Sequence, residues 1–250
     1  MTEPLAGGGP GDGSGPERYF FVHVQKTAGT ALQQRLRTQF PDEAIYPDES
    51  DGRPPNAVLV VEDLVERYRL RRDDIRVITG HFPLATTEVL RREFGDEFRT
   101  FTVLRDPVER TLSYLRHHRK LSAADRDLPL EAIYEDDFRY HGLIHNHMVK
   151  MLALTPEEMI AGVLTRVDFT PEHLERAKAA LETVDVVGVQ EEFEPFCDAL
   201  ADRFGWDLGD PLRANTTPEV EVTVVFTTVP AGELSTPAPP TVPTVRSVLS

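Results

Sequence analysis

A short apolar segment that runs into a turn with one lysine and one glycine places the strongest constraint on how this chain folds. Residues 19–24 are β-branched or aromatic almost throughout, which is the pattern of a buried parallel strand. The turn at residues 25–30 follows, and Leu32 and Leu36 then recur at helical spacing. A strand, a tight turn and a helix start point backbone N–H groups and a positive dipole end at an anion. The segment therefore predicts an anion-binding turn, to which Lys26 adds a full positive charge.

The residues of this turn narrow the kind of anion. The turn is not a Walker A loop, because G-x-x-x-x-G-K-[ST] is absent and Lys26 precedes Gly29. Its pattern, H-x-x-K-T-x-G-T after a strand, resembles the 5′-phosphosulfate loop of sulfotransferases that use 3′-phosphoadenosine 5′-phosphosulfate (PAPS). The resemblance implies a cofactor-binding set whose members are consecutive in the chain: Lys26, Thr27, Ala28, Gly29, Thr30 and Ala31.

A second strand-to-helix junction lies at residues 98–117. Residues 98–104 read as a strand, and Pro107 suits the first turn of the helix that follows, where its missing N–H costs nothing. Such a turn can bring Arg105 and Ser113 round one phosphate, with a guanidinium fork and a hydroxyl donor. An ordinary αβ unit with surface arginines is the alternative. The segment resembles the 3′-phosphate motif of the same family, R-[DE]-P-x-x-R-x-x-S-x-[YW], which implies that Arg105 and Ser113 bind the 3′-phosphate.

A histidine between the two motifs is the candidate base. Residues 75–79 read as a short strand, and His81 follows at its carboxyl end, where ligands bind in an open α/β sheet. With a reference pKa near 6.5, a histidine can accept a proton at neutral pH. A surface or capping histidine is the plainer interpretation. The segment V-I-T-G-H-F-P-L resembles the catalytic-histidine segment of sulfotransferases, which implies that His81 is the general base and that Lys26 assists the leaving group.

The second half of the chain extends the resemblance. Thr170 and Pro171 open a predicted helix, residues 184–190 read as a strand, and residues 191–206 as a helix with its stop. This run resembles the Golgi-type and bacterial carbohydrate sulfotransferases, relatives of the heparan sulfate 2-O- and 6-O-sulfotransferases, and the likeness covers residues 19–217. It implies a P-loop-like three-layer α/β fold, a parallel sheet flanked by helices, and a carbohydrate or other small hydroxyl acceptor.

Composition agrees with one soluble enzyme domain. The chain has 250 residues, 40% of them hydrophobic, and its strand and helix patterns alternate as in a doubly wound sheet. A net charge of −15 disfavours nucleic acid as a partner. Residues 105–120 are nevertheless rich in arginine, which suits either an anionic cofactor or a solvated helix face. We expect a flexible leader at residues 1–16, a sulfotransferase domain at 17–229 and a Pro/Thr-rich disordered tail at 230–250, with a strand at 220–229.

Cysteine and histidine usage bear on metals. Cys197 is the only cysteine, so no cysteine cluster exists, and it suits a buried position in an amphipathic helix. His141, His145 and His147 invite a metal reading, because positions i and i+4 share a helix face. No carboxylate follows at a recognisable spacing, and sulfuryl transfer needs no metal. We therefore expect no metal, and leave an acceptor-contacting or structural role open for these three histidines.

Location and partners follow from what the sequence lacks. The leader has no basic n-region or apolar h-region, and no apolar stretch approaches the roughly 18–20 residues of a membrane span. A cytoplasmic, bacterial enzyme is expected, without a membrane span and without nucleic acid as partner; the oligomeric state stays open. Residues 121–137 interrupt the pattern as a lid or acceptor-facing insertion.

The function predicted from these motifs is sulfuryl transfer from PAPS to a hydroxyl acceptor, by in-line attack with a histidine base. Two alternatives remain. A P-loop-like nucleotide or small-molecule kinase would need a Walker A loop and a magnesium carboxylate, and neither pattern is visible. The second alternative is a non-catalytic PAPS-binding protein, which the atypical sequence after residue 217 supports.

Overall fold

Five short parallel strands form the centre of the computed structural model, which describes residues 16–53 and 56–209. The strands lie in the order β2-β3-β1-β4-β5, and every neighbouring pair is parallel. Their bounds are Tyr19–Val22 for β1, Ile45–Tyr46 for β2, Val77–Ile78 for β3, Arg99–Leu104 for β4 and Val186–Val189 for β5. Because β1 lies between β3 and β4, the chain leaves the centre of the sheet in both directions. Ligands bind at this kind of switch point in open α/β sheets.

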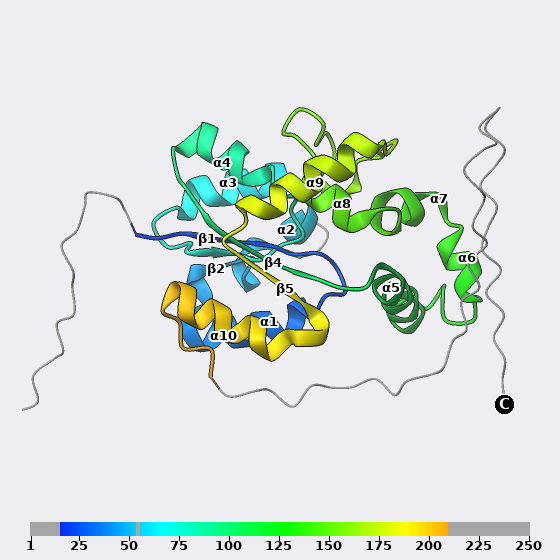
Figure 1. Ribbon diagram of the computed structural model, residues 1–250, viewed down its shortest axis with the longest axis horizontal. Coiled ribbons are helices and arrows are strands. Elements are labelled where there is room, and N and C mark those ends of the chain that lie inside the picture. Colours follow the sequence, from blue (N-terminus) through cyan, green and yellow to red (C-terminus); the bar gives the residue numbers. More distant parts are fainter. Residues whose placement is uncertain (1–15, 54–55, 210–250) are drawn as a thin grey trace, which may run out of the picture.

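The side chains of β1 alternate between two hydrophobic layers, as the two-residue period of a strand requires. Phe20 and Val22 belong to one core cluster, whereas Tyr19 and Phe21 belong to the other. Helices cover both faces of the sheet (Figure 1). One layer contains α1 (Gly29–Gln39) and α10 (Phe193–Phe204); the other contains α3 (Val61–Arg71), α4 (Thr86–Phe94), α8 (His147–Ala153) and α9 (Pro171–Thr183).

The remaining helices lie toward the carboxyl ends of the strands or join the layers. The longest is α5 (Pro107–Leu121), which Figure 1 shows beyond the end of the sheet together with α6 and α7. The shorter elements are α2 (Asn56–Leu59), α6 (Leu130–Tyr134), α7 (Asp137–Arg139), a π-helix (Tyr140–Ile144) and 3₁₀ turns at Asp42–Ala44, Glu49–Asp51, Gly162–Leu164 and Gln190–Glu192.

The predicted fold class is confirmed: a parallel sheet lies between two layers of helices. The predicted strands are present but shorter, since β1 ends at Val22 and β3 covers only Val77–Ile78. Thr170 caps α9 as expected, and His173 completes a capping box by accepting from the Thr170 backbone N–H. Cys197 is buried in α10, also as expected.

Several predictions concern residues that the structure does not describe. Four predicted features lie outside the described residues: most of the leader, the strand at residues 220–229, the tail at 230–250 and the C-terminal boundary of the predicted domain. Within residues 121–137, α5 extends to Leu121 and α6 adds a further helical turn. In the described part of the chain, no helix is both long and apolar enough to cross a membrane.

Candidate functional site

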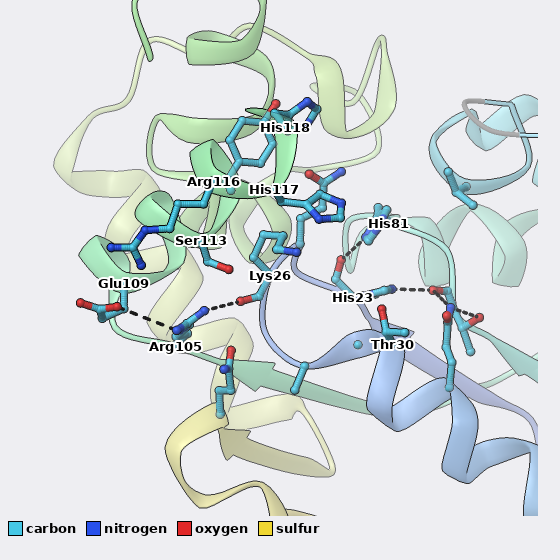
Figure 2. A pocket seen from close by; sticks show the side chains of 18 of the residues that line it. His23, Lys26, Thr30, His81, Arg105, Glu109, Ser113, Arg116, His117 and His118 are labelled. Atoms are coloured by element: carbon cyan, nitrogen blue, oxygen red, sulfur yellow. Dashed lines mark hydrogen bonds and ion pairs between the residues drawn. The ribbon is translucent and has the colours of Figure 1, made fainter. Parts of the chain in front are cut away.

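A cavity of about 1070 Å³ opens at the carboxyl edge of the three central strands. Lys26 follows β1, His81 follows β3 and Arg105 directly follows β4, and all three line this cavity. In Figure 2, Lys26 lies between Ser113 on one side and His81 on the other. Small-molecule sites typically occupy roughly 300–1,000 Å³, so the cavity has room for a nucleotide and part of a second substrate.

The turn after β1 presents its backbone to the cavity. Lys26 and Ala28 both have positive φ, 70° and 65°, so the chain reverses sharply before α1 begins at Gly29. The first bond within α1 runs from the Leu32 N–H to the Ala28 carbonyl, which leaves the preceding N–H groups without helical acceptors. No acidic residue lies in the first turn of α1 to satisfy them. The turn is therefore built to receive an anion.

Gly29 is required by close packing. A Cβ atom at this position would lie 1.7 Å from the Nε2 atom of His23, which is closer than any real contact. His23 is itself buried, and its ring nitrogen Nδ1 lies 2.8 Å from the Thr79 carbonyl oxygen. The His23 ring thus fixes the start of α1 against the end of β3. The H of the pattern H-x-x-K-T-x-G-T has this structural role, which the sequence analysis did not identify.

The other predicted members of the turn divide into two groups. Ala28, Gly29 and Thr30 line the cavity together with Lys26. Thr27 is fully buried, and its hydroxyl donates to the Val24 carbonyl oxygen at 2.9 Å, so that hydroxyl stabilises the turn from behind. Neither Thr27 nor Ala31 is among the residues that line the cavity.

The side chain of Arg105 contacts the backbone of the Lys26 turn. Nη1 of Arg105 donates to the Lys26 carbonyl oxygen at 3.3 Å, and Nη2 of Arg105 lies 3.9 Å from a carboxylate oxygen of Glu109. Nε of Arg105 is buried and has no hydrogen-bond partner within the described residues. Ser113 lines the same cavity two helical turns along α5. Burial, and then the charges of Arg105 and Arg110, lower the pKa of Lys26. The neighbouring positive charges also favour an anion beside Lys26.

His81 has a defined tautomer. Its Nδ1 lies 2.9 Å from the backbone carbonyl oxygen of His23, and a carbonyl can only accept, so Nδ1 carries the hydrogen of the neutral ring. The lone pair is therefore on Nε2, the atom that a general base would use. The rings of His81 and His23 have centroids 4.0 Å apart. Burial lowers the pKa of His81 to about 4, so the imidazole is neutral at physiological pH.

A buried cation joins the Lys26 turn to the π-helix. Arg110 is 1% exposed, and its guanidinium donates to the carbonyl oxygens of Gln25 and Leu143. Lys150 is fully buried and donates to the carbonyl oxygens of His141 and Gly142, also in the π-helix. Among the described residues neither cation has an ion-pair partner, and burial lowers the pKa of Arg110 to about 10 and that of Lys150 to about 8. Both therefore contribute positive potential behind the cavity.

The three histidines near this π-helix point in different directions. His141 lies 3.5 Å from an Asp137 carboxylate oxygen, and His145 stacks on Tyr140 with centroids 5.0 Å apart. His147 is 2% exposed, and neither of its ring nitrogens has a hydrogen-bond partner in the described structure. His141 and His145, four residues apart, do lie side by side, with ring centroids 6.2 Å apart, whereas His147 begins α8 after the left-handed residue Asn146. Residues 16–53 and 56–209 contain no cluster of three or more His, Cys, Asp or Glu able to hold a metal ion.

Several residues of the cavity wall were not singled out in the sequence. They come from α5, from α1 and from the end of β5: Glu109, Arg116, His117, His118, Lys120, Gln33 and Gln190. The sequence signal for the α5 group was the basic stretch at residues 105–120, for which an anionic cofactor was one of two interpretations. The structure places one side of this stretch on the cavity wall.

The chain is similar to solved structures but matches no family model and no curated protein. A crystal structure of a sulfotransferase from Alicyclobacillus acidocaldarius is similar to this chain at 17% sequence identity, with a TM-score of 0.44, over 82% of this chain and 87% of that one. At this TM-score the likeness assigns neither residue roles nor an activity to this chain.

Proposed function

We propose that the chain is a PAPS-dependent sulfotransferase. The observation that carries the proposal is the convergence of three motifs, far apart in sequence, on one cavity: the Lys26 turn, the Arg105 and Ser113 pair, and His81. The cavity wall is cationic although the whole chain carries a net charge of −15. A cationic cavity in an acidic protein favours a small anionic ligand over an anionic polymer.

The 5′-phosphosulfate would bind at the turn after β1. Lys26 supplies charge, the N–H groups at the start of α1 supply directed donors, and the exposed Thr30 adds a hydroxyl. In the proposed set, Thr27 and Ala31 would support the turn from behind, since neither lines the cavity and the Thr27 hydroxyl is already bonded to the Val24 carbonyl oxygen. Backbone donors fixed before binding need no reorganisation, which favours tight recognition of phosphate oxygens.

The 3′-phosphate would bind between Arg105 and Ser113. Arg105 fits this role because, among the residues that the structure describes, its buried Nε has no hydrogen-bond partner and its terminal nitrogens contact a carbonyl oxygen and a distant carboxylate. A phosphate dianion would give this guanidinium charge-assisted hydrogen bonds, and the Ser113 hydroxyl would add another. Since ATP and AMP lack a 3′-phosphate, this pair would give the site its selectivity for PAPS.

The chemical step would use His81 and Lys26. The acceptor hydroxyl oxygen attacks sulfur in line while its proton moves to Nε2 of His81, and the bond between sulfur and the bridging phosphate oxygen breaks. The bond's electron pair goes to that oxygen of the departing adenosine 3′,5′-bisphosphate, where Lys26 stabilises the growing negative charge. No metal takes part in this scheme, which relies on positioning and electrostatics as phosphoryl transfer does.

The acceptor, the cell compartment and the partners are proposed on other grounds than the cavity. A hydroxyl of a carbohydrate or similar small polyol is proposed as acceptor, on the resemblance of the sequence to carbohydrate sulfotransferases. A cytoplasmic, bacterial location is proposed on the same resemblance, and the net charge of −15 supports the proposal that nucleic acid is not a partner. Labelled PAPS offered to sugar, phenol and lipid panels tests the acceptor, and transfer to phenols alone would contradict the carbohydrate proposal.

Nucleotide affinity tests the cofactor assignment. Calorimetry should show that the protein binds adenosine 3′,5′-bisphosphate more tightly than AMP, which differs only by the 3′-phosphate, and more tightly than ATP with magnesium. Loss of a charged hydrogen bond costs about 1.5–3 kcal/mol, so Arg105→Ala should weaken binding of the bisphosphate at least about tenfold. The matched control is Arg119→Ala, an exposed arginine of the same helix that does not line the cavity.

Three results separate the alternatives. A preference for ATP with magnesium would favour a kinase and contradict the proposal. Tight binding of the bisphosphate without transfer to any acceptor would leave a non-catalytic PAPS-binding protein. Equal affinity for the bisphosphate in the wild type and in Arg105→Ala would remove Arg105 from the site.

A further inference from the structure

Glu109 lies between Arg105 and Ser113 in the sequence, and its side chain lies beside Arg105 in the structure (Figure 2). Arg105, Glu109 and Ser113 are spaced four residues apart, so they follow one another along one side of the α5 N-terminal region (Figure 2). All three line the cavity. Within the described structure, Glu109 is the only carboxylate among the residues that line the cavity. The cationic lining residues include Lys26, Arg105, Arg116 and Lys120.

The carboxylate of Glu109 is not needed to cap α5. Asp106 is the N-cap, and one of its carboxylate oxygens accepts from the backbone N–H groups of Val108 and Glu109 at 2.9 and 3.0 Å. The Glu109 side chain is 53% exposed, and its ion pair is with Nη2 of Arg105 at 3.9 Å. This contact is long enough, and exposed enough, to contribute little stability. A role toward the ligand of Arg105 therefore explains the position of Glu109 better than a role in folding.

A phosphate dianion on Arg105 and Ser113 would bring a second negative group to the guanidinium that Glu109 already contacts. Its oxygens would take donors of the same guanidinium that faces Glu109, and two like charges would then lie within one helical turn of each other. Glu109 must then swing away or remain and repel. In either case the free energy of binding is less favourable than Arg105 and Ser113 alone would give.

We infer that Glu109 competes with the nucleotide 3′-phosphate for Arg105, and so limits the affinity for 3′-phosphorylated nucleotides. The inference rests on the proposed function, because it assumes that Arg105 and Ser113 hold a 3′-phosphate. Its consequence is faster release of the bisphosphate product, which shares the 3′-phosphate with PAPS. Product release sets turnover in many enzymes.

Calorimetry on Glu109→Gln tests this inference. Glutamine keeps the size of the side chain and removes its charge, so the variant should bind adenosine 3′,5′-bisphosphate about three- to tenfold more tightly than the wild type. Its affinity for AMP, which has no 3′-phosphate, should not change. Half-molar salt should shrink the difference, because the repulsion between an exposed carboxylate and a phosphate is screened.

Two controls keep the outcome interpretable. Glu182→Gln makes the same change of net charge on the exposed side of α9, away from the lining residues, and should leave both affinities unchanged. Glu109→Ala repeats the test with a side chain that cannot form a hydrogen bond to Arg105, as the glutamine amide could.

The possible results are distinct. Unchanged or weaker binding of the bisphosphate in both Glu109 variants would overturn the inference, and weaker binding would instead make Glu109 a residue that orients Arg105. Equal tightening toward AMP would also overturn it, since the effect would not depend on the 3′-phosphate. If the wild type does not prefer the bisphosphate over AMP, the proposed function itself fails.

Discussion

Replacement of Gly29 by alanine should disrupt the packing between the Lys26 turn and His81, the proposed base. The new Cβ would lie 1.7 Å from Nε2 of His23, and 2.5 Å from two ring carbons of the same side chain. The ring of His23 cannot move freely, because it is buried and bonded to the Thr79 carbonyl oxygen. It also packs against His81, whose Nδ1 bonds to the His23 backbone.

The magnitude follows from these contacts. Overpacking a filled core costs about 1–3 kcal/mol, and leaving a buried hydrogen-bonding group unsatisfied costs about 1–3 kcal/mol more. Gly29→Ala should therefore lower the free energy of unfolding by about 2–5 kcal/mol, and urea unfolding measures this directly. Gly142→Ala is the matched control, since its Cβ would meet only a Leu164 methyl group at 3.4 Å.

A double-mutant cycle isolates the cause. In a His23→Ala background the obstacle is gone, so Gly29→Ala should lower the free energy of unfolding by less than about 1 kcal/mol there, with a coupling energy of about 1 kcal/mol or more. The reasoning is refuted if Gly29→Ala is as stable as the wild type, or if the two substitutions add without coupling.

Three further predictions concern charge and metals. Burial lowers the pKa of His23, His81 and His147 in the folded protein, so the unfolded chain binds more protons below pH 6.5. Urea unfolding should therefore show stability falling as the pH drops through that value, by up to about 1.4 kcal/mol per pH unit for each histidine. A flat stability profile from pH 7.5 to 5 would contradict this prediction. Arg110→Met should lower the free energy of unfolding by about 2–5 kcal/mol, because buried carbonyl groups of the Lys26 turn and the π-helix lose their hydrogen-bond donor. An unchanged urea unfolding curve would contradict this prediction. Turnover should survive EDTA, since the sequence has no magnesium-binding pattern beside the Lys26 turn, and a collapse restored by one divalent ion would return the kinase alternative.

The sequence was sufficient for the features that depend on local pattern. The strands after which Lys26, His81 and Arg105 lie are where alternation and apolar runs predicted them, although β3 is reduced to two residues. Pro107 and Thr170 open helices as their backbone preferences require. Parallel strands have their carboxyl ends at one edge of the sheet, so the predicted strands were sufficient to predict that Lys26, His81 and Arg105 lie close together.

What the sequence did not predict depends on contacts between distant segments. The Gly29 and His23 contact, the tautomer of His81 and the link from Arg110 to the π-helix each join parts of the chain that no periodicity relates. The break between the π-helix and α8 also explains the histidines: Asn146 adopts a left-handed conformation, with φ 46°, and the new helix that begins at His147 places this residue in the interior.

Turnover of His81→Asn tests the central claim most directly. Asparagine is similar in size but cannot take a proton, so transfer from labelled PAPS should fall by about 10²–10⁴-fold, while affinity for adenosine 3′,5′-bisphosphate stays close to that of the wild type. The acid limb of the wild-type pH profile should be displaced below pH 6.5, toward the lowered pKa of His81, and should be absent in the variant. Near-normal transfer by His81→Asn would contradict the account, because another residue would then be the base.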